Sequence, residues 1–175
     1  MGKQSLKLFG THAVISIFIF LFSSMIMAGA KSEFVHWLFT VMYLAMFWSI
    51  TWVGYVNEGN NDLKRERFTP YKGFIIGALV QIPALLTYIV LMAEAGRNWI
   101  WIPRVLMRGW LSPYLKIASL EGFRDTDWWG ILFILLYIAG VGVAYLFGKK
   151  RREKTLRVIA ERESMRGELS KRDSE

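Results

Sequence analysis

Cysteine is absent from this sequence of 175 residues. Disulfides, zinc–thiolate sites and iron–sulfur clusters are therefore excluded, because each of them needs cysteine. The absence also means that thiol usage carries no information about the compartment of the protein. The sequence motifs of common hydrolases and nucleotide-binding enzymes are missing as well, namely His-Glu-x-x-His, Gly-x-Ser-x-Gly and the Walker loop. We therefore expect a protein that is not an enzyme and that binds no cofactor or metal.

Charged residues are absent from four long apolar stretches, which begin at Leu8, Phe34, Gly73 and Trp128. Each stretch has about the 20 residues that an α-helix needs to cross a hydrocarbon core roughly 30 Å thick. Many tryptophans and tyrosines lie near the ends of these stretches, where amphipathic rings sit at headgroup depth. The sequence therefore predicts an all-α, polytopic membrane protein with four transmembrane helices. The predicted spans cover about residues 8–30, 34–57, 73–95 and 128–148.

The remaining sequence is too short to bury a separate soluble core, so residues 1–148 are predicted to form one four-span domain. Residues 149–175 are highly charged, lack proline and are rich in helix formers. This tail is predicted to continue the fourth helix as a basic cytoplasmic helix. Its first basic residues are attracted to anionic headgroups at about 1 kcal/mol each, although a signal that stops translocation is the simpler interpretation. These residues are Lys149, Lys150, Arg151 and Arg152.

Positive charge is in excess, with 22 Lys and Arg against 14 Asp and Glu. Nucleic acid would be a candidate partner for a soluble chain of this charge, but here most of the positive charge flanks helices, and no nucleic acid is expected. Most of the basic residues fall on one side of the predicted membrane. The positive-inside rule then places both termini in the cytoplasm and the protein in the cell membrane.

The N-terminal segment also resembles a secretory signal peptide, with Lys3 and Lys7 before an apolar run and with Ala28-Gly29-Ala30 as a small-residue cleavage site. Cleavage there would leave three spans. Retention is favoured, because the apolar run continues to Met27 without a polar region and Lys31 leads directly into the next span. The predicted orientation of the remaining chain is the same in both cases.

Short links set the expected arrangement of the first two helices. Residues 30–33 allow only a tight antiparallel hairpin between them. Residues 57–62, Asn-Glu-Gly-Asn-Asn-Asp, tolerate turn geometry and are predicted to end the second helix. A calcium loop is disfavoured, because the EF-hand spacing and its terminal glutamate are absent.

Small residues recur at intervals of four in the third and fourth spans, which is typical of close helix contact within a chain or between subunits. Pro83 predicts a kink in the third span, and Gln81 beside it is the only amide well inside any span. We interpret Gln81 as an interhelical hydrogen-bonding residue; contact with a solute is the alternative. The small residues are Gly73 and Gly77 in the third span, and Gly140, Ala144 and Gly148 in the fourth.

The connection over residues 97–124 combines tryptophans with basic residues and is predicted to be an outer segment lying in the membrane interface. Pro103 allows a helix to begin near it, and Pro113 ends that helix or divides it in two. A re-entrant loop is the alternative, but it would have to bury several arginines. The residues expected to contact lipid phosphates or other anions are Arg97, Arg104 and Arg108.

Three functions are compatible with these patterns. The leading hypothesis is an accessory or structural subunit that packs against another membrane protein or a second copy of itself and has no catalytic chemistry. The second is a transport component for a lipophilic or anionic solute, with Gln81 and Pro83 at its site. The third is an interfacial lipid-modifying enzyme that uses Glu121, Asp125 or Asp127. His12 and His36 are expected on opposite sides of the membrane, where they could not share a metal.

Overall fold

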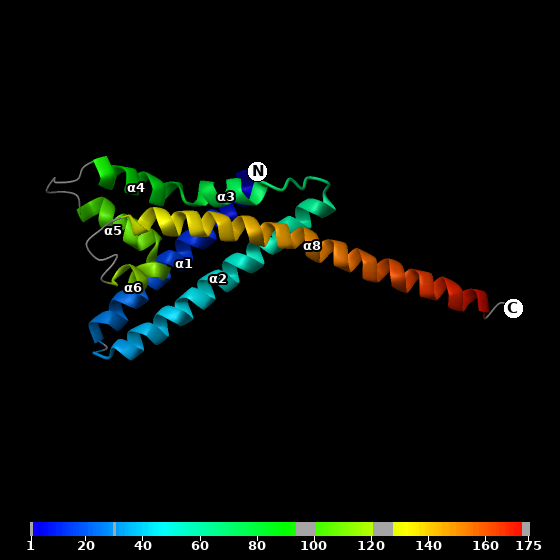
Figure 1. Ribbon diagram of the computed structural model, residues 1–175, viewed down its shortest axis with the longest axis horizontal. Helices are drawn as coiled ribbons and strands as arrows, with labels where there is room; N and C mark the ends of the chain where they lie inside the picture. The colour runs from blue at the N-terminus through cyan, green and yellow to red at the C-terminus, as the bar shows by residue number, and fades with distance from the viewer. Residues whose placement is uncertain (1, 30, 94–100, 121–127, 173–175) are drawn as a thin grey trace.

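The computed structural model describes residues 2–29, 31–93, 101–120 and 128–172 (Figure 1). Every secondary-structure element in these ranges is helical, which confirms the predicted all-α class. The elements are α1 (Gly2–Gly29), α2 (Glu33–Lys64), α3 (Lys72–Val80), α4 (Ile82–Ala93), α5 (Trp101–Trp110), the 3-10 turn η1 (Ser112–Tyr114), α6 (Leu115–Ala118) and α8 (Trp129–Arg172).

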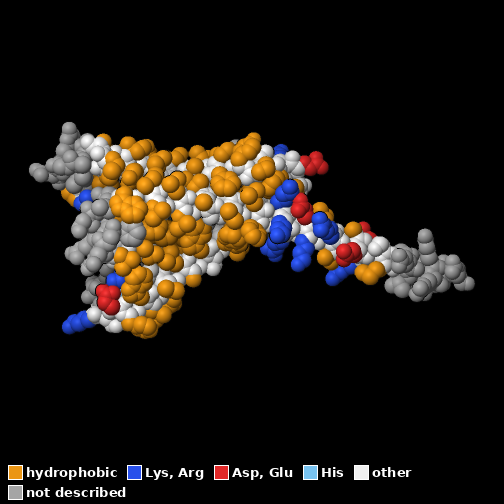
Figure 2. Space-filling model, viewed as in Figure 1, with side chains coloured by type: hydrophobic (Ala, Val, Ile, Leu, Met, Phe, Trp, Pro, Cys, Tyr) orange, Lys and Arg blue, Asp and Glu red, His pale blue; other side chains and the backbone are white. Residues whose placement is uncertain are grey.

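Three of these helices are long and apolar enough to cross a membrane. Their candidate spans are Leu6–Ile26 in α1, Glu33–Lys64 in α2 and Trp129–Met165 in α8, and α3 with α4 would add a fourth if the bent pair crosses as one span. Apolar side chains cover the visible face of the bundle, whereas charged side chains gather on the protruding end of α8 (Figure 2). This distribution is consistent with a multi-pass membrane protein, because a bilayer solvates exposed apolar side chains.

The predicted end of the second helix at residues 57–62 is wrong, because α2 continues through this segment to Lys64. Tertiary contacts offset the poor helix propensity of its asparagines and glycine. Gly59 packs against the backbone of α8, and Asp62 is buried and paired with Lys72. The helix ends where Glu66 adopts a φ of 55° and the Arg65 N–H bonds to the Asn61 carbonyl.

The third predicted span is broken into α3 and α4, which meet at an angle of 56°. The break is at Gln81, whose N–H bonds to the carbonyls of Gly77 and Ala78 at 3.2 Å and 3.1 Å. Pro83 is the second residue of α4, in the first helical turn, where an N–H has no helical partner. The chain therefore bends two residues before the proline and restarts as a helix that accommodates it.

Helix α8 is the central element of the bundle and packs against α2, α3 and α4. Backbones approach closely at glycines: a Cβ on Gly59 would lie 2.2 Å from the Tyr145 carbonyl oxygen, and one on Gly148 would lie 2.3 Å from that of Val56. Large fully buried side chains fill the space around α8. They include Phe47, Tyr55, Ile76, Trp129, Tyr137 and Tyr145.

The segment from α5 to α6 packs into the bundle, against α1, α2 and α4. Ser16 Oγ donates to the Trp110 carbonyl at 3.0 Å, and Ser112 Oγ donates to the Ser16 carbonyl at 2.7 Å. Ser16 is the central residue of the candidate span Leu6–Ile26. One face of α5 is buried at Pro103 and Met107, and its opposite face carries exposed apolar side chains. The segment therefore forms part of the core as well as part of the apolar surface.

Candidate functional site

A cavity of about 330 Å³ lies between α1 and α2, with one wall from α8. It is at the end of the bundle where α1 begins and α2 ends. We call this the basic end, defined by Lys7, Lys64, Lys72 and Lys149. Its volume is at the lower end of the range of about 300–1,000 Å³ for small-molecule pockets. Its lining includes Lys7, His12, Thr51, Tyr55, Glu58 and Tyr137.

The most unusual lining residue is His12, which is only 3% exposed. Its ring is surrounded by aromatic rings, with centroids at 4.8 Å for Trp110, 4.9 Å for Tyr137 and 5.3 Å for Phe47. Neither ring nitrogen makes a hydrogen bond of normal geometry, although the backbone of Trp110 lies close to the ring. Both ring nitrogens are out of reach of a water-sized probe, so His12 contributes little polar surface to the cavity.

Two tyrosine hydroxyls extend this polar region deeper into the bundle. Tyr55 of α2 and Tyr137 of α8 have their hydroxyl oxygens 3.5 Å apart, and both side chains are buried. Tyr137 also packs its ring on His12. The inner part of the cavity therefore combines aromatic surface with hydroxyl and imidazole groups.

A buried ion pair lies next to the cavity. Lys72, the first residue of α3, donates to Oδ2 of Asp62 near the end of α2. Tyr145 of α8 donates to the same carboxylate oxygen at 2.7 Å. The Lys72 and Asp62 side chains are 7% and 2% exposed, so this contact is buried. It joins α2, α3 and α8.

Glu58 connects the ion pair to the cavity. Its Oε1 lies 3.6 Å from Lys72 Nζ, and its side chain is 12% exposed. This oxygen is buried and has no hydrogen-bond donor, and Glu58 lines the cavity. Two carboxylates thus share one ammonium group, and Asp62 holds it more closely. Glu58 therefore places in the cavity wall a carboxylate that Lys72 holds less closely than it holds Asp62.

The small residues predicted for helix packing all lie at contacts within the chain. Gly73 and Gly77 of α3 face residues 138–145 of α8, Gly140 faces the Trp48 ring, and Gly148 faces the α2 backbone. Ala144 is buried between them. These surfaces are occupied inside the bundle.

Gln81 is buried, with 1% exposure, and neither amide atom has a hydrogen-bond partner. It lies at the break between α3 and α4, and other residues line the cavity at the basic end.

Of the arginines expected to bind anions, Arg104 and Arg108 are half-buried on α5, and Arg97 lies outside the described residues. Glu121, Asp125 and Asp127 lie outside them too. The basic residues 149–151 of α8 are exposed. The Nζ atom of Lys149 lies 5.7 Å from the centroid of the Phe68 ring.

Sequence reasoning missed the group formed by Glu58, Asp62 and Lys72. Asp62 and Glu58 fall in a segment with turn composition, and Lys72 reads as a flanking charge, so nothing local marks them as buried. His12 reads only as a polar residue near the start of a span. One available signal for this group was the presence of opposite charges on the two sides of the short link after α2.

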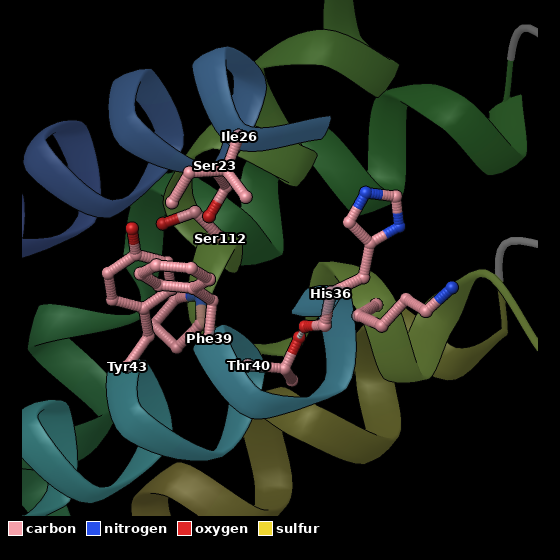
Figure 3. A pocket seen from close by; sticks show the side chains of 9 residues that line it. Ser23, Ile26, His36, Phe39, Thr40, Tyr43 and Ser112 are labelled. Carbon is pink, nitrogen blue, oxygen red and sulfur yellow. Dashed lines mark hydrogen bonds between the residues drawn. The ribbon is translucent and has the colours of Figure 1, made fainter. Parts of the chain in front are cut away.

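A second, smaller cavity of about 30 Å³ lies toward the opposite end, between α1, α2 and η1. Figure 3 shows side chains from these elements converging on it, among them Ser23, Thr40 and Ser112. Beside it, Lys116 donates to Glu33 at 2.8 Å. Its volume is that of one or two water molecules, which is too small for a solute.

No family model, curated protein or solved structure matches this chain.

Proposed function

We propose that this chain acts in a cell membrane as a transport component that holds a small, partly apolar solute between α1 and α2. The observation that carries the proposal is the cavity of about 330 Å³, whose wall combines apolar side chains with a few polar groups such as Thr51 and Glu58. Small-molecule sites commonly have this composition. In the proposed orientation both termini and the basic end face the cytoplasm.

The broken helix supports a transport role. Transporters often use discontinuous helices, whose two halves can move relative to each other. Here α3 and α4 are separated at Gln81 with a bend of 56°, and α3 packs against α1 and α8. Both α1 and α8 contribute to the cavity, so motion of α3 would reach the site.

Native mass measurement of the purified full chain in mild detergent tests the proposal. We expect a small molecule to be retained by the wild type and lost from Thr51→Phe, in which the larger ring fills the cavity. Thr155→Phe on the exposed part of α8 is the matched control and should retain the molecule. A wild type that carries no small molecule, or equal retention in Thr51→Phe, would contradict the transport proposal.

A second candidate is the accessory subunit, supported by the part of α8 beyond residue 148. This helix extends away from the bundle as a single element (Figure 1), and its apolar side chains Leu156, Ile159 and Met165 are exposed. A partner membrane protein or a second copy could cover them, while the basic residues that precede them contact anionic headgroups. Removal of residues 153–175 should then abolish a stoichiometric partner seen in native extraction; unchanged co-purification would contradict this role for the helix.

A further inference from the structure

The cavity at the basic end has the chemistry to recognise an organic cation, which we propose as its ligand class. Its ammonium group would lie against Glu58, and its apolar part against the walls from α1 and α2. The inference rests on the proposed solute-binding role and names the charge of the solute, for which the sequence suggested a lipophilic or anionic molecule.

The two carboxylates beside Lys72 are compensated unequally. Asp62 accepts hydrogen bonds from both Lys72 and Tyr145, so its charge is locally compensated. Glu58 is farther from the ammonium, at 3.6 Å, and its buried Oε1 has no donor. A partly desolvated carboxylate attracts a cation more strongly than one in water, because the local dielectric constant is lower. Glu58 lines the cavity.

The inner wall of the cavity is aromatic. Tyr55, Tyr137 and His12 all line the cavity. The faces of aromatic rings carry negative potential and attract ammonium groups, most strongly where water is excluded. Tyr55 and Tyr137 are buried, so their rings meet this condition.

Another part of the cavity wall is apolar. Ile50 and Val53 line the cavity and are also exposed on the outer surface of α2, and Leu8 lies opposite them on α1. An amphiphilic molecule could keep its apolar part along this wall while its charged group reaches Glu58. The cavity therefore suits a lipophilic amine better than a fully hydrated ion.

Lys7 is the lining residue that opposes a cation. It is exposed near the start of α1, and its long side chain can direct the ammonium group away from the cavity into water or headgroups. The two charged lining residues should therefore influence ligand affinity in opposite directions. A nonspecific effect on folding would not produce affinity changes of opposite sign in the two variants.

The experiment is equilibrium binding of ethidium, a fluorescent aromatic cation, to the full chain in maltoside micelles, with the anion fluorescein as a comparison. We expect saturable ethidium binding, a loss of about tenfold or more in affinity for Glu58→Gln, and a gain of about twofold or more for Lys7→Gln. Glu161→Gln, on the exposed part of α8, is the matched control and should bind like the wild type. Glu58→Gln should fold, because Lys72 keeps Asp62 as its partner.

Fluorescein binding as tight as ethidium, or no loss for Glu58→Gln, would overturn the cation assignment. If neither dye binds while a native small molecule is still retained and is displaced by Thr51→Phe, the cation assignment fails and the transport proposal stands. If no native molecule is retained and Thr51→Phe leaves dye binding unchanged, both fail. Should Glu58→Gln not yield a monodisperse protein, the opposite shift in Lys7→Gln still decides the sign of the preferred charge.

Discussion

Tyr145 on α8 donates a 2.7 Å hydrogen bond to Oδ2 of Asp62 on α2, across 83 positions of the chain. The same oxygen accepts a hydrogen bond from Lys72 on α3. Three helices that are separate in the sequence therefore meet at one carboxylate. The stability of the basic end should depend on this contact.

Lys72→Met should strongly destabilise the protein, because it leaves Asp62 and Glu58 buried without their cation. Loss of one partner of a buried ion pair typically costs about 3–5 kcal/mol. Tyr145→Phe removes one hydrogen bond to the carboxylate and should cost about 1–3 kcal/mol. Unfolding in mixed micelles of maltoside and dodecyl sulfate measures both. Glu153→Gln on exposed α8 is a control, and a Lys72→Met variant as stable as that control would show that the pair is dispensable.

Gly148→Ala should destabilise the contact between α2 and α8. The added Cβ would lie 2.3 Å from the Val56 carbonyl oxygen and 2.8 Å from the Asn60 nitrogen, and a backbone cannot move aside as a flexible side chain can. We expect a loss of about 2 kcal/mol or more in unfolding free energy. Gly10→Ala is the opposite case, since nothing lies within 4 Å of its Cβ, and it should gain up to about 1 kcal/mol from helix propensity. Equal effects of the two substitutions would argue against the close helix contact.

Cysteine cross-linking can test the insertion of the α5–α6 segment, since the chain has no native cysteine to interfere. The double variant Ser16→Cys and Ser112→Cys should form a disulfide on mild oxidation, because Ser112 Oγ reaches the Ser16 carbonyl at 2.7 Å. Mass measurement would detect the loss of two hydrogens. Ser16→Cys with Thr155→Cys is the control, as residue 155 lies in the helix that extends away from the bundle (Figure 1). Cross-linking of the control variant, without cross-linking of the variant with Ser16→Cys and Ser112→Cys, would place the α5–α6 segment elsewhere.

Gln81→Leu should raise the unfolding free energy, by about 1 kcal/mol, because it removes a buried amide that has no hydrogen-bond partner. Ethidium binding and retention of a native molecule should not change, since the cavity at the basic end is lined by other residues. Denaturation and native mass measurement on the same sample give both values. Loss of the bound molecule from Gln81→Leu would instead support the alternative interpretation, in which Gln81 contacts the solute.

The sequence by itself determined the class of this protein. Uncharged apolar stretches of spanning length predict helices, because within lipid a single segment can satisfy its backbone only as a helix, and the described ranges are helical. The same local reasoning located a bend near Pro83, because proline lacks the N–H that a continuous helix needs. It also found the small residues at which helices approach each other.

Only the tertiary structure decided what these features are used for. Composition alone could not distinguish a helix end at residues 57–62 from a helix held by distant partners, and the contacts of Gly59 and Asp62 with α8 and α3 extended α2 to Lys64. Likewise, the burial of His12 depends on rings from three other elements. The cavity, its charge and the occupied glycine surfaces arise from contacts between helices far apart in the chain, and the free energy of such contacts has no local signature in a single sequence.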